Sequence, residues 1–433
     1  MTDRRLSPMG SFAVVWAGQQ LSLIGSRIAQ LALVWWLTDL TGSATVLATA
    51  SMVALLPEIL LGPVAGAYVD RWDRRVVMMV ADGLIALASL WLAYLFWADA
   101  MRIWDIYVMM LLRAVGGSFH WPAMQASTSL MVPRKHLTRV AGLNQTMNGV
   151  LSVAGPPLGA LLLGLLPPHG VMLTDVGTAL LAILPLLFVR VPRPLRSDPE
   201  EGAVPSIWSD IREGLQYIGD WPGLIALIGL AMMVKIALTP AFSLLPLLVR
   251  EHFNGDAAQL SLLESVAGMG ILVGGLVLSA WGGFRRKIYT TMTGMAALGL
   301  AFVVLGLTPA ALFWAALVSI FVVGFMIPLV DGPIMAILQG TVSPEVQGRV
   351  FTMMGSLLSL TSPIGLAVAG PVSDWLGLQV WYLTAGLLAA AAGVAGFFIP
   401  ALVYVEDNHV GSRLDREGRH CASPAPAATE VRD

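Results

Sequence analysis

Residues 66–75 read Gly66-Ala67-Tyr68-Val69-Asp70-Arg71-Trp72-Asp73-Arg74-Arg75; they complete one long apolar run, residues 43–69, and lead into a second, residues 76–98. A transmembrane helix needs about 20 predominantly apolar residues, and each run supplies that length. The charged residues between them are typical of a loop at a membrane face. The pattern therefore predicts two transmembrane helices joined by a short basic loop.

The composition extends this interpretation to the whole chain. Of 433 residues, 57% are hydrophobic and 12% are charged, whereas soluble domains carry about 25% charged residues. Lipid permits only helices or closed barrels, because each backbone polar group needs an internal partner. The apolar runs are continuous and do not alternate, so helices are favoured over a barrel. The first run, Phe12–Leu37, is longer than the apolar core of a signal peptide, and we interpret it as a retained span.

We predict an all-α integral membrane protein with twelve transmembrane helices in two six-helix bundles. The predicted spans are residues 12–38, 43–69, 76–98, 103–131, 140–166, 171–190, 222–249, 259–281, 288–307, 310–340, 346–372 and 378–404. The predicted domains are an N-terminal bundle (1–190), a cytoplasmic linker with an amphipathic helix (191–220), a C-terminal bundle (221–405) and a disordered cytoplasmic tail (406–433).

The linker prediction rests on Val191–Pro205, which is rich in Pro, Arg and acidic residues, and on an apolar face at helical spacing from Ile207 to Ile218. A second feature relates the two halves. Residues 275–286 are a degraded copy of residues 66–75, with Ser279 in place of the acid, as expected of a transporter built from two repeats.

Basic residues fix the predicted orientation. Of the 25 Lys and Arg residues, 20 fall on one side of the predicted spans, and only Arg102 and Arg250 fall on the other. The positive-inside rule then places both termini in the cytoplasm. The remaining three, Arg27, Arg113 and Lys235, lie inside spans. We expect a bacterial-type inner membrane.

Several classes of function have no support. A net charge of −2 argues against a nucleic-acid partner, and the single cysteine, Cys421, with no Cys/His cluster argues against a metal or other cofactor. The chain has no phosphate loop, HExxH or nucleophile motif, so we do not expect an enzyme. A membrane-embedded scaffold or receptor remains the alternative to a transporter.

Three motifs resemble the major facilitator superfamily: Gly66-x-x-x-Asp70-Arg71-x-x-Arg74-Arg75, Arg113-x-x-Gly116-Gly117 and Gly155-Pro156-x-x-Gly159. The second and third are similar to signatures of its drug:proton antiporters. In the first, Asp73 stands where the superfamily usually has Gly.

Four further segments resemble exporters of the macrolide-efflux type. They are Trp16-Ala17-Gly18-Gln19, Phe119-His120-x-Pro122-Ala123, Phe253-Asn254-Gly255 and Gly348-Arg349-Val350-Phe351. The resemblance implies a monomeric secondary exporter that exchanges protons for a hydrophobic or amphiphilic small molecule by alternating access. Related exporters handle siderophores and other amphiphiles, so that class of cargo stays open.

Ionisable residues inside the spans are the leading functional candidates, because each costs about 2.5 to 3.5 kcal/mol at the membrane centre on insertion scales. His120 lies two helical turns from Arg113 on one face, where a titratable group beside a fixed cation suits proton exchange, although buried structural histidines are common. The candidates for proton coupling are Arg113, His120, Glu58, Glu264 and Asp331.

The motifs also supply candidate gating residues. Asp70 is placed to accept hydrogen bonds from Arg74 or from a helix N-terminus, which would latch the cytoplasmic end, and the alternative is a loop that only sets topology. Gly155-Pro156 bends its helix, either for rocking or only for packing. The gating candidates are Asp70, Arg71, Arg74, Asp82, Gly155, Pro156 and Gly159.

Polar and aromatic residues near the presumed cavity are candidates for cargo contact. Trp36 lies near the end of a span, where an interfacial aromatic belt explains it equally well. Lys235 is also a candidate for an ion pair with Asp331. The substrate-binding candidates are Gln19, Gln30, Trp36, Trp121 and Lys235.

Overall fold

The structure is a computed structural model of the full chain, and it describes residues 8–189, 216–219, 221–342 and 344–406. Within these ranges the chain is helical and contains no strand. The twelve long helices are α1 (Pro8–Thr41), α2 (Ala44–Arg71), α3 (Arg74–Trp97), α4 (Ile103–Met131), α5 (Leu137–Leu165), α6 (Pro168–Phe188), α8 (Pro222–Ser243), α10 (Ala257–Trp281), α11 (Lys287–Leu307), α12 (Phe313–Thr341), α13 (Pro344–Leu376) and α14 (Leu378–Gly396).

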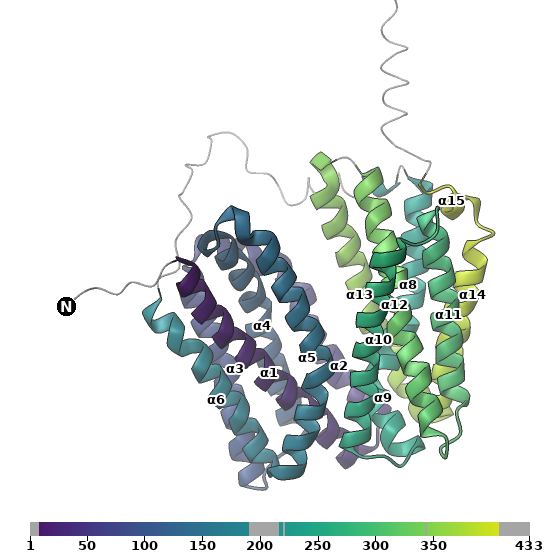
Figure 1. Cartoon of the computed structure of the whole chain (residues 1–433). Coiled ribbons are helices and arrows are strands. Elements are labelled where there is room, and N and C mark those ends of the chain that lie inside the picture. Colours follow the sequence, from purple (N-terminus) through teal and green to yellow (C-terminus); the bar gives the residue numbers. More distant parts are fainter. Residues whose placement is uncertain (1–7, 190–215, 220, 343, 407–433) are drawn as a thin grey trace, which may run out of the picture.

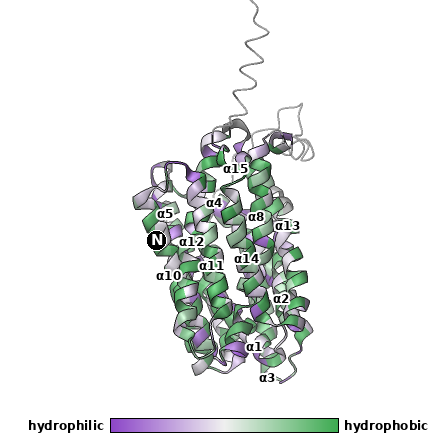
Figure 2. Ribbon diagram, turned by 90° about the vertical axis from the view of Figure 1, so that its right-hand side faces the viewer, coloured by the Kyte–Doolittle hydropathy of each residue, from purple (hydrophilic) through white to green (hydrophobic). Residues whose placement is uncertain are grey.

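These helices confirm the all-α membrane fold. Among the described residues, eleven helices are long and apolar enough to cross a membrane. The twelfth long helix is α4, which carries Arg113 and His120. The outer faces of the bundles are largely hydrophobic (Figure 2), with side chains such as Leu276 and Phe188 mostly exposed. Lipid is the solvent that such a surface requires.

Two predicted spans end earlier than expected, and proline explains both differences. The span predicted for residues 222–249 stops at Ser243, and a short helix, α9 (Leu245–Leu247), and a π-helical turn, η2 (Leu248–His252), follow it. The span predicted for residues 378–404 divides into α14 and α15 (Pro400–Val403). Proline lacks the backbone N–H of an internal helical residue, so Pro246 and Pro400 each sit in the first turn of a new segment.

The two halves of the chain pack in the same way. In the first half, α1 contacts α5 and α6, α3 contacts α4 and α6, and α2 contacts α4. In the second half, α8 contacts α13 and α14, α11 contacts α12 and α14, and α10 contacts α12. Each pair in one half has its counterpart in the other, as the sequence echo between residues 66–75 and 275–286 predicts.

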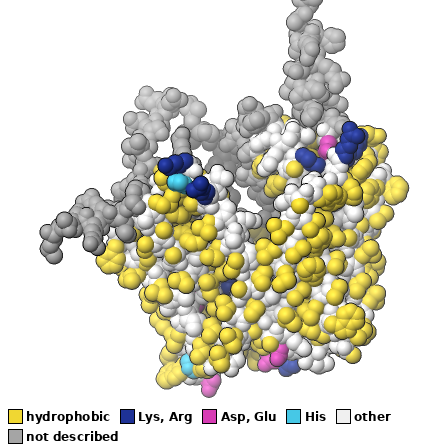
Figure 3. Space-filling view, viewed as in Figure 1, with side chains coloured by type: hydrophobic (Ala, Val, Ile, Leu, Met, Phe, Trp, Pro, Cys, Tyr) yellow, Lys and Arg dark blue, Asp and Glu magenta, His cyan; other side chains and the backbone are white. Residues whose placement is uncertain are grey.

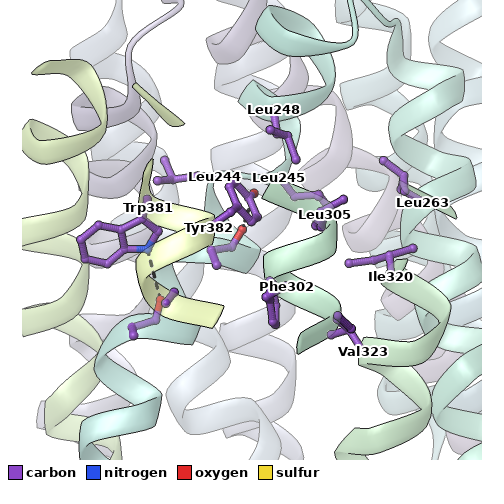
Figure 4. Packing of buried hydrophobic residues seen from close by; sticks show 14 of the residues in the cluster. Leu244, Leu245, Leu248, Leu263, Phe302, Leu305, Ile320, Val323, Trp381 and Tyr382 are labelled. Carbon is purple, nitrogen blue, oxygen red and sulfur yellow. Dashed lines mark hydrogen bonds between the residues drawn. The ribbon is translucent and has the colours of Figure 1, made fainter. Parts of the chain in front are cut away.

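The core of the second bundle packs around two aromatic residues of α14 (Figure 4). Tyr382 is fully buried and its hydroxyl donates a 2.6 Å hydrogen bond to the carbonyl of Ala241, while the Trp381 indole donates to the carbonyl of Ala237 at 3.1 Å. Their rings pack with Phe302 and neighbouring leucines of α8 to α12. A buried hydroxyl or indole N–H needs such a partner, so these bonds fix α14 against α8.

The bundles meet along two helix pairs, α2 with α13 and α5 with α10. They converge at one end, called here the closed end, where α1 ends and α2 begins, and they diverge toward the other, the open end (Figure 1). At the closed end Gly370 lets α13 approach α2, since a Cβ there would lie 2.8 Å from Cα of Thr45. At the second contact, a Cβ on Gly268 of α10 would lie 2.8 Å from the carbonyl oxygen of Ser152 in α5.

The predicted linker and tail lie outside the described residues, apart from residues 216–219, which are helical, and Glu406. The amphipathic helix expected from Ile207 therefore stays a prediction, as do the domain boundaries at residues 190 and 221 and the disordered tail.

Candidate functional site

Two cavities lie between the bundles. The molecular surface is also hollowed between the bundles toward the open end (Figure 3). The larger, about 530 Å³, lies between α2, α8 and α13. The smaller, about 260 Å³, lies between α1, α5 and α10. Both bundles contribute side chains to both cavities, so a bound molecule would contact both bundles.

The larger cavity contains two of the predicted ionisable residues. Glu58, halfway along α2, faces a space that Lys235 of α8 also lines. Asp331 of α12 is close enough to Lys235 to interact with it electrostatically. The predicted pairing of Lys235 with Asp331 is thus a Coulombic interaction inside the second bundle, and Glu58 faces them from the first.

The smaller cavity contains a cation and an acid from different bundles. Arg27 of α1 and Glu264 of α10 both line it, and the arginine acts electrostatically on the carboxyl group. Gln30, one turn after Arg27, lines it as well, together with Pro156 of α5. Attraction between Arg27 and Glu264 therefore acts across the boundary between the bundles.

Arg113 lies in neither cavity. It pairs with Asp175 of α6 inside the first bundle, and Asp175 is fully buried. The hydroxyl of Ser89 in α3 donates to Asp175 at 2.6 Å, and that of Ser26 in α1 donates to it at 3.0 Å. The arginine also bonds Ser89. Four helices thus meet at one buried carboxylate, and neither Glu58 nor His120 is the partner of Arg113.

His120 belongs to a second polar cluster. Its Nε2 donates to the amide oxygen of Gln19 at 2.7 Å and lies 3.3 Å from Oδ1 of Asp82. The Gln19 amide in turn donates to Oδ2 of Asp82 at 2.9 Å. An amide oxygen only accepts, so Nε2 carries the proton in this arrangement. Residues expected to act in coupling, cargo contact and gating therefore form one network.

The two polar clusters lie two helical turns apart along the same three helices, α1, α3 and α4. Gln19 and Ser26 on α1, Asp82 and Ser89 on α3, and His120 and Arg113 on α4 are each seven residues apart. Seven residues are two helical turns, about 10.5 Å along the axis. The first bundle therefore has two buried polar layers, while the buried core of the second bundle around Tyr382 is apolar.

The candidate gating residues outside α5 lie either at the junction of α2 and α3 or in the His120 network. Arg74 donates to the carbonyl of Ala126 in α4 at 2.9 Å, and Arg71 is exposed. The side chain of Asp70 lies outside the described part of the structure, so its contacts stay a prediction. Asp82 belongs to the His120 network described above.

The glycines of the third motif face α1 within the first bundle. A Cβ on Gly159 would lie 2.7 Å from the Leu31 side chain of α1, and a Cβ on Gly155 would lie 3.8 Å from Arg27. Gly159 therefore lets α5 approach α1, whereas Pro156 faces the cavity shared with α10. The small face of α5 packs within its own bundle.

The closed end is fastened by a carboxylate on a helix N-terminus. Asp374 of α13 accepts from the backbone N–H of Ala44 at 2.7 Å and of Thr45 at 3.0 Å, and from the Ser43 hydroxyl at 3.0 Å. An anion at the N-terminus of α2 is favoured by the helix dipole. An exposed ion pair between Asp39 and Arg250, at 2.8 Å, joins the bundles at the same end.

The predicted cargo contacts are only partly brought together. Gln30 and Lys235 line the cavities, whereas Gln19 is buried in the His120 network. Trp36 packs edge-on against Phe96, with ring centroids 5.3 Å apart. Trp121 on α4 is exposed but is not among the residues lining either cavity.

Sequence reasoning missed or left unassigned several residues. Asp175 is a carboxylate within the apolar run of α6, so the rule that selected Arg113 would also have selected it. Arg27 lies inside a predicted span, but no motif in the sequence indicates a role for it. Asp374 gave no signal, because an acid at a helix end is common and its partner, the start of α2, is distant in sequence.

Comparison with known proteins identifies the family. The model of the Major Facilitator Superfamily matches residues 15–356 and, in an overlapping second match, residues 224–429. The chain belongs to the major facilitator superfamily. Members of this superfamily are transporters, so this chain is a multi-pass membrane transporter and the scaffold alternative is not favoured.

Curated relatives within the superfamily cover most of the chain. Macrolide efflux protein A of Streptococcus pyogenes is 33% identical over 377 residues, which are 87% of this chain and 93% of that protein. Macrolide efflux protein A of Enterococcus faecalis is 31% identical over 325 residues, 75% of this chain and 100% of that protein. The multidrug efflux pump Tap of Mycobacterium tuberculosis is 27% identical over 398 residues, with coverage of 88% and 91%.

Solved structures of the superfamily share the fold. A bacterial homologue of the iron transporter ferroportin matches with a TM-score of 0.69 and 14% identity, covering 90% of this chain and 99% of that one. The nucleoside transporter NupG matches with a TM-score of 0.65 and 13% identity, covering 87% and 98%. At such identities these likenesses show the fold alone.

Proposed function

We propose that this protein is a proton-coupled exporter of amphiphilic small molecules of the macrolide type, working by alternating access. The relatives named for macrolide and multidrug efflux support export of such a cargo. The observation that carries the proposal is that oppositely charged intramembrane residues of the two bundles face shared cavities. The proposed transporter acts as a monomer.

The proposed conformation is inward-facing. The positive-inside rule places the open end, where α2, α4, α10 and α12 end, in the cytoplasm. The closed end, fastened by Asp374 and by the pair of Asp39 with Arg250, then faces the outside. In this state cargo enters from the cytoplasm. In the opposite state, Asp70 is the proposed latch of the cytoplasmic end.

The proposed coupling uses Glu264 and Arg27. When Glu264 is ionised, its attraction to Arg27 holds α10 against α1 and α5. Protonation removes the charge of Glu264 and leaves Arg27 uncompensated, so the balance between the two states changes. A proton entering the cell supplies about 2.3 kcal/mol per 100 mV of membrane potential in addition to the pH gradient.

Transport by purified protein in liposomes tests the proposal. With an imposed pH gradient, wild-type protein inserted inside out is expected to concentrate a macrolide inside the liposomes. Glu264→Gln, which cannot release or take up the proton, is expected to lose concentrative transport while still equilibrating cargo down its own gradient. Asp105→Asn, a helix cap at the start of α4 that lies outside both cavities, is the matched control.

Two results would contradict this proposal. If wild-type protein moves no amphiphile in either gradient direction, the chain is not an exporter of this class. If Glu264→Gln still builds a gradient as the wild type does, the coupling residue is elsewhere.

The orientation is tested by a reporter fused after Val410. We expect activity only from a reporter that works in the cytoplasm, because 20 of the 25 basic residues lie on the side of the termini. The same fusion to a reporter that works only outside the inner membrane is the control. Activity of that second fusion would invert the assignment of the open and closed ends.

A further inference from the structure

One face of α13 presents a row of hydroxyl groups to the larger cavity. Thr352, Ser356, Ser359 and Ser362 all line it, at spacings of four, three and three residues that place them on one helical face. Leu55 and Ile59 of α2 line the same cavity. The space is thus polar on its α13 side and apolar on part of its α2 side.

These hydroxyls differ from those elsewhere in the bundles. Serine and threonine in membrane helices commonly bond a carbonyl one turn back, as Ser265, Ser319 and Thr361 do here. Within the described residues, none of the four hydroxyls that face the cavity forms a hydrogen bond to the protein. Their donors and acceptors are therefore available to a molecule in the cavity.

The charges around the cavity favour a cation. Lys235 and Asp331, which belong to the same bundle, interact electrostatically. Glu58 is exposed toward the cavity and forms no ion pair among the described residues. Glu58 is therefore available to pair with a cationic group in the cavity, and the hydroxyl row lines the same space.

We propose that this cavity binds the polar end of the cargo, an amine-bearing group with several hydroxyls such as an amino sugar. Glu58 pairs with the protonated amine, and the hydroxyls of α13 exchange hydrogen bonds with those of the ligand. Leu55 and Ile59 contact the adjoining apolar part. This inference rests on the proposed export function and assigns a subsite within it.

Binding by the purified full-length protein tests the subsite with three probes. They are a macrolide whose sugar carries a secondary amine, its N-acetyl derivative, which keeps the hydroxyls and loses the charge, and its aglycone. Glu58→Gln is expected to weaken binding of the amine about tenfold or more, and that of the N-acetyl probe less than about twofold. Ser356→Ala with Ser359→Ala is expected to weaken both glycosylated probes several-fold and to leave the aglycone unchanged.

Ser279→Ala is the matched control, because this hydroxyl on α10 bonds the carbonyl of Gly275 and lies outside the cavity. It should change no affinity. The inference is overturned if wild type binds the three probes equally, or if Glu58→Gln weakens the amine and its N-acetyl derivative alike. In either case cargo transport in liposomes still decides the proposed function separately, since an exporter with another subsite would still move the aglycone.

Discussion

Replacing Arg113 with alanine is expected to lower the free energy of unfolding by about 3 to 5 kcal/mol, the usual cost of removing one partner from a buried ion pair. Asp175 is fully buried, and without the guanidinium only the hydroxyls of Ser26 and Ser89 would remain to stabilise its charge. The unfolding midpoint of the purified protein in detergent measures the loss. Arg113→Lys keeps a charge but not the planar fork, so it should fall between wild type and alanine.

A double variant separates stability from transport. Arg113→Met with Asp175→Leu removes both charges at similar volume, and replacing a buried ion pair with apolar residues is often neutral or stabilising. We expect this variant to regain the wild-type unfolding midpoint. If it also builds a cargo gradient under an imposed pH gradient, the pair only stabilises the bundle, whereas a stable but uncoupled double variant assigns it to proton coupling. An Arg113→Ala protein as stable as wild type would contradict the importance of the pair.

Replacing Asp374 with alanine is expected to open the closed end. The exposed carboxylate accepts from two backbone N–H groups and one hydroxyl at the start of α2, as an N-cap side chain does, so the contact contributes about 1 to 2 kcal/mol. Its loss should shift the balance between the inward-facing and outward-facing states roughly tenfold. Asp374→Asn keeps an acceptor without the charge and should have a smaller effect.

Spin labels at Leu40 and Leu376, both exposed near the closed end, report this shift as an increased population of longer distances. Cys421→Ser provides a background without cysteine, since the chain has one. Asp256→Ala is the matched control, because Asp256 caps its own helix α10 at the same end and does not join the bundles. Equal distance distributions in wild type and Asp374→Ala would show that other contacts hold this end.

The fold was predictable because lipid imposes a strict rule on sequence. Apolar runs of about 20 residues separated by charged loops located all twelve helices, and the largest boundary errors arose where Pro246 and Pro400 restart a helix. The local motifs also indicated which superfamily to expect. Which helices touch was less accessible, since faces that pack on protein and faces that meet lipid are equally apolar.

The site was predictable as a set of residues but not as a set of contacts. The cost of burying charge selects Arg113, His120 and Glu264 from sequence. It does not say that Arg113 meets Asp175 or that Glu264 meets Arg27, because these partners are on helices distant in the chain. The seven-residue spacing of Gln19 with Ser26 and of Asp82 with Ser89 is visible in the sequence. It indicates two buried polar layers only once α1, α3 and α4 are placed side by side.

The two contacts between the bundles are alike in packing but not in chemistry. The start of α2 is capped by Asp374 from the other bundle, whereas the start of α10 is capped by its own Asp256. Asp374 therefore fastens α13 to α2 at the closed end, whereas α5 and α10 meet near the middle of both helices, at the glycine contact with Ser152, where Arg27 of α1 also attracts Glu264. We expect the two bundles to rotate about the contact between α5 and α10 when the closed end opens. Cargo would then leave between α2 and α13, beside the cavity that contains Glu58.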